Sequence, residues 1–342
     1  MDVGPDPAPI KAHPPTRNAP IEELVRSEWK RGLVDVQDTV HRATVEFWWA
    51  RGARHVMLPL TTSAVSSPMG LGSDSSPVAV QMHGHQTYLA DSMQFLLEYG
   101  CRFVDYGCYY LMPSFRGEQP DATHLREFFH SEAEVRCDFD TLLVLVEDYV
   151  RSLAAAILDH HEELLAAHGG SDHLVRLLDS PPFVRLTFDQ AWEELRGDPA
   201  MVERDGRHGF RNLRRAGELA LIDRFGPAVW ITHWDRMAVP FYQARDSQTG
   251  QALQADLLLG PGEVAGAGQR HVGSPEVSLA LEEHSVSADD YEWYLGMKEH
   301  APLQTSGFGL GVERFLMWAL GHDDIRDVQL APRLGPPDGA VP

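Results

Sequence analysis

Two strand-like segments joined by a long polar loop constrain the fold of this chain more than any other feature. Residues 102–115 are rich in aromatic and β-branched residues, and residues 128–137 alternate between polar and apolar side chains. The segments VWITHW, PFYQAR and ALQADLLLG also read as strands, again with only loops between them. Because neighbouring parallel strands need long crossover connections, this order predicts an antiparallel sheet with helices packed on it, an α+β fold.

Several helical patterns accompany the strands. Apolar residues recur at three- and four-residue steps over 21–53, and Gly52 is a candidate C-cap. The clearest helix follows Asp138 and is expected to end at Gly169 and Gly170. Residues 170–225 predict short helices and turns, and the last helix is expected after the glycines of SGFGLGVERF. A short strand is expected at 86–90, with loops at 66–76 and 116–127.

Composition excludes several classes of protein. The formal net charge is −21 and only three residues are lysine, so the chain lacks the basic footprint of a nucleic-acid binder and a polybasic membrane patch. No stretch approaches 18 continuous apolar residues, and the proline-rich start does not resemble a signal peptide, which predicts a cytoplasmic protein. The three cysteines are too few for a disulfide framework and are expected to be buried thiols.

Two polar stretches border the first loop. In PSFRGE, Arg116 sits where a strand emerges and offers a bidentate donor for an anionic ligand; the alternative is a surface pair between an arginine and a glutamate. Further on, His130, Glu132 and Glu134 share one face of a strand. If that face is buried, the carboxylates must be paired, bind a metal or recognise an ammonium group; if it is exposed, they are ordinary surface residues.

Two glycine-rich stretches lie nearer the C-terminus. In PGEVAGAGQRH, glycines allow close approach of a ligand, while Glu263 offers an oxygen ligand for Mg²⁺ and Arg270 a carboxylate-binding fork; a simple glycine-rich turn is the alternative. In SGFGLGVERF, three glycines precede a helix, which suggests phosphate at the helix N-terminus with Arg314 close by. This spacing is not that of the dinucleotide-binding fingerprint.

Together these stretches resemble the catalytic domain of the class II aminoacyl-tRNA synthetases, most closely the asparaginyl/aspartyl branch. SFRGE and HLREFFHSEAE resemble motif 2 of that family, and SGFGLGVERFLMWALGHDDIRDVQLAPR resembles motif 3. GEVAGAGQR resembles the GEI-x-GG-x-QR stretch, and SMQFLLE resembles the amino-acid loop of the asparaginyl form. The segments PFYQARD and YEWYLGMKEH also fit. The resemblance covers about residues 20–335.

The resemblance implies a six- or seven-stranded antiparallel sheet flanked by helices. It also implies a homodimer formed through motif 1, at about residues 34–62. The implied reaction joins a carboxylate to ATP, giving an acyl-adenylate and pyrophosphate without a covalent enzyme intermediate. The implied domains are a disordered arm at 1–20, one catalytic domain at 21–335 and a disordered tail at 336–342.

The resemblance also assigns roles to single residues. Arg116 would hold the α-phosphate, Glu118 and Phe128 the adenine, and His124 and Arg314 the outer phosphates. Arg116 and Arg314 would thus be the catalytic residues, and Gly309 and Gly311 would let ATP approach the chain. Glu263 would carry Mg²⁺, with Asp256 as the second carboxylate. The amino group of the substrate would meet Ser92 and Gln94, and Arg270 would bind the far end of a dicarboxylic or amide side chain. Glu132 would also bind the substrate.

The acceptor of the activated group is less closely constrained. Only a proline-rich arm precedes motif 1, where the asparaginyl and aspartyl synthetases carry an anticodon-binding domain, and the chain is acidic. We therefore expect transfer to ammonia or another small amine, with tRNA an unlikely partner. The alternatives are a minimal ligase that charges tRNA and a catalytically inactive paralogue. Departures from the family pattern at Met93, at residues 266–268 and at Thr305 all fall near the expected amino-acid pocket and favour a non-standard substrate.

Overall fold

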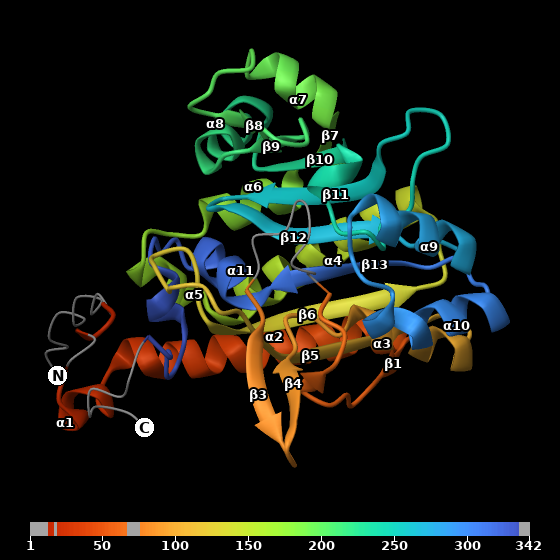
Figure 1. Ribbon diagram of the computed structural model, residues 1–342. Coiled ribbons are helices and arrows are strands. Elements are labelled where there is room, and N and C mark those ends of the chain that lie inside the picture. Colours follow the sequence, from red (N-terminus) through yellow and green to blue (C-terminus); the bar gives the residue numbers. More distant parts are fainter. Residues whose placement is uncertain (1–12, 17–18, 67–75, 335–342) are drawn as a thin grey trace, which may run out of the picture.

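An eight-stranded sheet forms the centre of the computed structural model, which describes residues 13–16, 19–66 and 76–334 (Figure 1). In spatial order the strands are β1 (Arg54–His55), β5 (Gly107–Phe115), β6 (Glu127–Val135), β13 (Ser306–Gly311), β12 (Gly262–Gln269), β11 (Ala252–Leu259), β10 (Ala228–Trp234) and β7 (Val184–Thr187). The six central strands pair antiparallel, and the two edge strands pair in parallel. The α+β class is confirmed, but the sheet has two short parallel edges that the sequence did not predict.

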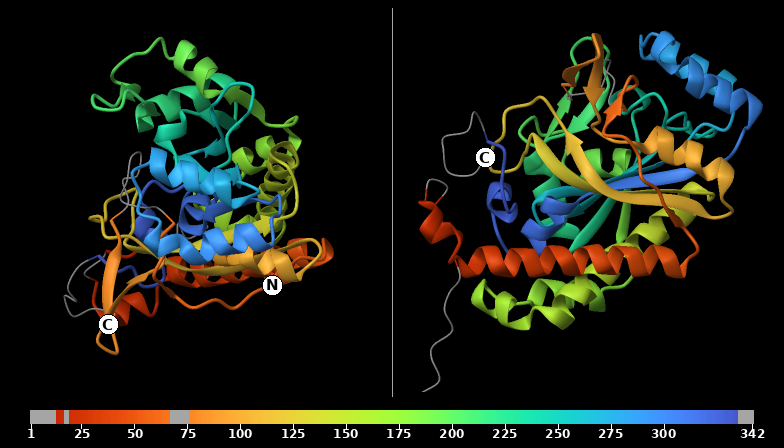
Figure 2. Two further views of the ribbon diagram at one scale, coloured as in Figure 1. Left: turned by 45° about the vertical axis from the view of Figure 1, so that its right-hand side comes forward. Right: turned by 90° about the horizontal axis from the view of Figure 1, so that it is seen from below.

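Two long helices cover one face of this sheet, as Figure 2 shows from below. The helix α2 (Glu28–Ala50) begins at a Ser27 cap, and α4 (Phe139–His160) begins at an Asp138 cap. Trp48 on α2 and Tyr149 on α4 pack against Phe308 of β13, with ring centres 5.8 and 5.6 Å apart. This face of the sheet therefore contributes to the main hydrophobic core.

The opposite face is bordered by shorter elements. A small sheet of β2 (Thr61–Thr62), β3 (Val78–Met82) and β4 (His85–Leu89) and the helix α3 (Gln94–Gly100) lie on the β5 side (Figure 1). The remaining elements are α5 (Glu162–Ala167), α6 (Asp172–Asp179), α7 (Phe188–Glu194), β8 (Val202–Arg204), β9 (Arg211–Leu213), α8 (Arg215–Phe225), α9 (Ser274–Glu283), α10 (Glu292–His300) and α11 (Val312–Ala319).

Several expected elements differ in the structure. The first helical stretch is broken, with α1 (Ile21–Leu24) separate from α2, and the α4 helix ends at His160 rather than at the glycines. His161 leaves helical geometry at φ −131° and its ring bonds Thr39 Oγ1 at 2.8 Å. PFYQAR is not a strand and makes only isolated bridges at Gln243 and Arg245. Both glycine-rich stretches are strands, β12 and β13, rather than loops.

Three remaining expectations concern membrane-spanning helices, the cysteines, and the loop and termini of the chain. Among the described residues no helix is long and apolar enough to cross a bilayer. The cysteines are free, with Cys101 and Cys108 buried and Cys137 half-buried. The loop at 66–76 and the arm and tail at 1–20 and 336–342 lie largely outside the described residues.

Candidate active site

Four glycines remove the side chains from the middle of the open face. Gly307 and Gly309 of β13 pair with Gly268 and Gly266 of β12. Because side chains on a strand alternate between faces, all four share the face that α2 and α4 do not cover. A Cβ atom at Gly307 or at Gly268 would collide with a neighbouring side chain. The sheet therefore presents a strip of backbone that is bare of its own side chains. Glu132, Glu134 and Gln243 lie over Gly309, Gly307 and Gly268, so the strip is open to a ligand at Gly266.

Polar side chains flank this strip in two rows across the sheet. In one row Glu132 of β6 pairs with Gly309, and Asp256 of β11 pairs with Gly266. In the next row Glu134 and Gln254 occupy the corresponding positions beside the other two glycines. The predicted common face of the β6 residues is thus confirmed, and it is the face that bears the strip.

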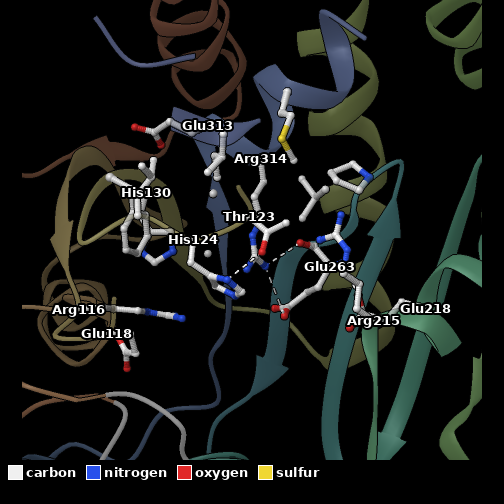
Figure 3. A pocket seen from close by; sticks show the side chains of 18 of the residues that line it. Arg116, Glu118, Thr123, His124, His130, Arg215, Glu218, Glu263, Glu313 and Arg314 are labelled. Carbon is white, nitrogen blue, oxygen red and sulfur yellow. Dashed lines mark hydrogen bonds and ion pairs between the residues drawn. The ribbon is translucent and has the colours of Figure 1, made fainter. Parts of the chain in front are cut away.

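A cavity of about 490 Å³ opens at one end of the strip, a volume suited to a small molecule or cofactor. Figure 3 shows arginines entering it from different elements: Arg116 from the end of β5 and Arg314 from α11. Every residue predicted to bind ATP lines this cavity: Arg116, Glu118, His124, Phe128, Glu263, Gly309, Gly311 and Arg314. Residues distant in the sequence therefore meet at one site, although their roles remain predictions.

Two polar atoms in the cavity wall lack partners within the described part of the chain. Arg116 Nε and Glu118 Oε2 are buried and make no hydrogen bond there. The Arg116 guanidinium lies 5.5 Å from the centre of the Phe128 ring, so a planar group that stacked on the ring would also lie near the charge. A buried donor without a partner is costly unless a ligand supplies one, which fits an anionic ligand carrying a planar base.

Arg314 and His124 bind the protein itself in this structure. Arg314 Nη1 donates to the main-chain oxygen of Glu263 at 2.9 Å and lies 3.9 Å from its carboxylate. The His124 ring is about half exposed and lies 3.1 Å from Asp121 Oδ1. Both contacts are weak enough to exchange for phosphate oxygens, because each lies at the water-accessible side of the site.

Asp256 and Glu263 are the candidate ligands of the predicted magnesium ion. A Cβ atom on Gly266 would be 3.4 Å from Glu263 Oε1 and 3.7 Å from Asp256 Oδ1, so both carboxylates approach one point. Burial and the Glu263 charge raise the pKa of Asp256, and burial and the same charge raise the pKa of Glu218. Such mutual repulsion fits a cation site. No three metal-ligating side chains form a cage among the described residues, and Mg²⁺ commonly uses one or two carboxylates together with phosphates.

The predicted amino-acid residues lie beside the cavity rather than in its wall. Ser92 Oγ donates to Glu132 Oε2 at 2.6 Å, the Tyr110 hydroxyl donates to the same oxygen, and His130 Nδ1 lies 3.1 Å from Oε1. His130 also lines the cavity, so it connects the two sites. Burial raises the pKa of Glu132 to about 7, and burial together with the charges of Arg116 and Arg314 lowers that of His130 to about 3. Glu132 is a buried carboxylate in direct contact with neutral groups, which suits an ammonium ligand.

Arg270 is held by a buried ion pair. Its guanidinium makes three contacts of 3.0–3.2 Å with both oxygens of Glu134, and both side chains are almost completely buried. Arg270 Nη2 also donates to Gln94 Oε1 at 2.9 Å, and Gln94 Nε2 donates to the Tyr242 hydroxyl at 2.6 Å. The structure therefore joins Gln94 to Arg270, whereas the sequence placed Gln94 at the amino group.

The comparisons with known proteins agree with this geometry. Residues 20–335 match the family of class II tRNA synthetases (D, K and N). The chain is 30% identical to an asparagine–tRNA ligase of Chloroflexus aurantiacus and 27% identical to that of Koribacter versatilis, covering about 90% of this chain and 70% or 68% of those proteins. The crystal structure of asparaginyl-tRNA synthetase from Pyrococcus horikoshii complexed with asparaginyl-adenylate superposes with a TM-score of 0.81 at 26% identity, over 90% of this chain and 70% of that one.

The chain belongs to the class II tRNA synthetases. This confirms the resemblance found in the sequence and the expected class of enzyme, an ATP-dependent ligase that forms an aminoacyl-adenylate. The substrates are accordingly ATP and an amino acid of the asparagine or aspartate type. The expectation that tRNA is not a partner gains no support, because these relatives are tRNA ligases.

Some residues of the synthetase site were not predicted as functional. Arg215 and Glu218, at the start of α8, line the cavity, although the sequence predicted only short helices and turns in that segment. Glu313 also lines it; burial raises the pKa of Glu313 to about 7, and Gln329 Nε2 donates to its carboxylate at 2.7 Å. Nothing in the local sequence around Gln329 indicated this contact.

Proposed function

We propose that the protein activates asparagine or aspartate with ATP and transfers the activated acyl group to tRNA. In the first step a carboxylate oxygen of the amino acid attacks the α-phosphorus of ATP, and the bond to the β-phosphate oxygen breaks to release pyrophosphate. The step needs positioning and charge neutralisation rather than a protein nucleophile.

The side chains divide this work by position. Arg116 would neutralise the α-phosphate, Phe128 and Glu118 would hold the base, and Arg314 would release Glu263 and bind the outer phosphates. Glu132 would hold the substrate's ammonium group beside the bare strip. Asp256 and Glu263 would hold Mg²⁺, which supplies further positive charge at the phosphates.

The observation that carries this proposal is that a buried donor without a partner among the described residues and a buried carboxylate lie at the same end of the strip. An unpaired cationic donor, Arg116 Nε, lines the cavity, and a buried anion in contact with neutral groups, Glu132, lies beside it. ATP–pyrophosphate exchange without tRNA tests it, with asparagine, aspartate and unrelated amino acids compared. Exchange is expected with asparagine or aspartate but not with the unrelated amino acids, and exchange with none of the amino acids would refute activation.

The choice of tRNA as acceptor is supported by the relatives and by the local charge. The relatives are asparagine–tRNA ligases. Between residues 196 and 224 the acidic chain carries seven arginines against five acidic residues, and Arg215 of this segment lines the cavity. Phosphate contacts of this kind supply much of the affinity for nucleic acid. Aminoacylation of total tRNA, measured as acid-stable incorporation of labelled amino acid, tests this acceptor.

A small amine remains the second candidate acceptor, because the net charge of −21 opposes binding to a polyanion. Release of AMP that depends on ammonia or hydroxylamine but not on tRNA would establish it. A catalytically inactive paralogue is not favoured. Arg116 Nε and Glu118 Oε2 are buried and have no partner among the described residues, as expected in a site that still binds a ligand.

We also propose that the protein forms a homodimer through residues 34–62. Within this segment Trp49 is 74% exposed and Met57 is 92% exposed, and large apolar side chains in one region often mark an interface. Light scattering is expected to give twice the mass of one chain, and a mass of one chain would contradict the dimer.

A further inference from the structure

Two glutamines connect the amino-acid site to the candidate magnesium site. Gln243 is the glutamine of the segment PFYQAR, and its side chain lies over Gly268. A Cβ atom at Gly268 would collide with the carboxamide of Gln243. Gln254 lies in β11 directly opposite Gly268. The absence of a side chain at Gly268, one of the departures from the family pattern, is what gives Gln243 room to lie on the sheet.

Hydrogen bonds run through these glutamines in one direction. Arg270 Nη1 donates to Gln243 Oε1 at 2.7 Å, Gln243 Nε2 donates to Gln254 Oε1, and Gln254 Nε2 donates to Asp256 Oδ1 at 2.8 Å. A guanidinium can only donate, so it requires the oxygen of Gln243 to face it. That orientation turns the amide nitrogen of Gln243 toward the oxygen of Gln254. The amide nitrogen of Gln254 then faces Asp256, whose Oδ1 atom accepts its hydrogen bond.

The contact with Arg270 therefore fixes which way the carboxamide of Gln243 faces. Its oxygen uses one lone pair for Arg270 and retains a second. The carboxamide is fixed from both ends and is 4% exposed, so little freedom remains for it to turn when a ligand arrives. Gln243 thus presents a hydrogen-bond acceptor next to the donors of Arg270.

The charge of Arg270 is already balanced at this position. Glu134 contacts the guanidinium with both carboxylate oxygens, and neither residue is more than a few per cent exposed. A second carboxylate, from a substrate, would meet a neutralised guanidinium and the fixed oxygen of Gln243. A substrate carboxamide would instead accept from Arg270 with its oxygen and donate to Gln243 with its nitrogen.

We infer that Gln243 is a specificity-determining residue that selects a carboxamide over a carboxylate at the end of the substrate side chain, with Gln254 as its positioning residue. This inference rests on the proposed activation of asparagine or aspartate at the same site. A site that offers a matched donor and acceptor rejects an analogue that leaves one of them unpaired more strongly than an apolar pocket can.

The test compares kcat/KM for asparagine and for aspartate in ATP–pyrophosphate exchange. The wild-type protein is expected to favour asparagine. Gln243→Met keeps the length of the side chain but removes the acceptor, so the asparagine-to-aspartate ratio is expected to fall at least about tenfold. Gln243→Glu keeps an acceptor and adds negative charge, so the ratio is expected to hold or rise. Gln254→Ala releases Gln243 and is expected to lower the ratio without removing the acceptor.

Gln248→Glu is the matched control, because Gln248 is exposed and five residues along the chain; it is expected to leave the ratio unchanged. A wild-type preference for aspartate, or a ratio that Gln243→Met and Gln254→Ala leave within about twofold, would overturn the inference while activation itself stands. Exchange with neither amino acid would overturn the proposed function, and the inference with it. If Gln243→Met fails to fold, the other two variants still decide between these outcomes.

Discussion

Glu132 is the residue whose electrostatics bear most directly on substrate binding. Burial raises its pKa to about 7, above the value of an exposed glutamate. A folded protein that favours the protonated form is most stable below the ordinary pKa of the group and loses that stability as the pH rises through about 7. An ammonium ligand needs the ionised form, so its binding has the opposite dependence on pH.

The first prediction follows from these opposite dependences of stability and ligand binding on pH. Between pH 8 and pH 6 the KM for the amino acid is expected to rise about tenfold, because most Glu132 side chains become protonated. Glu132→Gln is expected to raise KM at pH 8 and to remove the dependence, while increasing thermal stability at that pH. Steady-state exchange at several pH values, together with thermal unfolding, measures both effects. A Glu132→Gln protein with unchanged KM would contradict the assignment.

A second prediction concerns Arg116. Its Nε atom has no partner among the described residues, so the folded protein gains little from it. Arg116→Ala is expected to lower kcat for adenylate formation by about 10²–10³-fold, with a small change in thermal midpoint. Arg207→Ala, at an exposed position of the β8–β9 hairpin, is the control and should match the wild type. If Arg116→Ala lowers the thermal midpoint so far that unfolding accounts for the lost activity, Arg116 has a structural role instead.

At the scale of elements, some glycines of the strip are required for folding, whereas others leave room for the substrate. A Cβ atom at Gly266 would make ordinary contacts, at 3.4 Å or more, whereas one at Gly307 would collide with Glu134 and lie 2.7 Å from the main-chain oxygen of Ala133. The two positions therefore predict different outcomes for the same substitution.

Gly266→Ala is expected to fold normally but to raise the KM for ATP or for the amino acid, because the methyl group occupies the strip. Gly307→Ala is expected to lower the free energy of unfolding by about 1–3 kcal/mol. Gly206→Ala, with nothing within 4 Å, controls for the substitution itself. Chemical denaturation and exchange kinetics measure the pair, and normal kinetics in Gly266→Ala would show that the substrate does not lie on the strip.

The sequence predicted these elements unevenly, for physical reasons. Alternation of polar and apolar residues located β6 and its functional face, because the pattern of side chains is itself the signal. The glycine-rich segments that form β12 and β13 were not predicted as strands, because glycine carries no side chain to alternate. PFYQAR was read as a strand from its β-forming residues, yet only Gln243 and Arg245 in it form bridges, and those are isolated.

At the scale of the whole molecule, motif spacing revealed more than composition did. The order of four motifs predicted the family, and the succession of strands joined by loops predicted the α+β fold. The fold brings the eight residues predicted to bind ATP to one cavity. Contacts that depend on three-dimensional packing, such as the chain from Arg270 through Gln243 and Gln254, could not be predicted from local patterns. The parallel edges β1 and β7 were also missed, because they are only two and four residues long.

The net charge of −21 bears on the acceptor rather than on the fold. If tRNA is the acceptor, the arginines of segment 196–224 are expected to make its phosphate contacts. Arg204→Ala combined with Arg207→Ala should then weaken aminoacylation most at low salt, with a deficit that shrinks as salt is raised, and should leave ATP–pyrophosphate exchange unchanged. Equal effects on both reactions would contradict a role for this segment in binding tRNA.

The central claim is that the site makes an aminoacyl-adenylate. A single-turnover reaction with enzyme in excess over α-labelled ATP, with Mg²⁺ and asparagine or aspartate but no acceptor, tests it most directly. We predict that the label appears in an enzyme-bound aminoacyl-adenylate, that pyrophosphate is released in equal amount, and that Arg116→Ala forms both about 10²–10³-fold more slowly. ATP that remains intact with both amino acids, or that yields ADP and phosphate, would contradict the account.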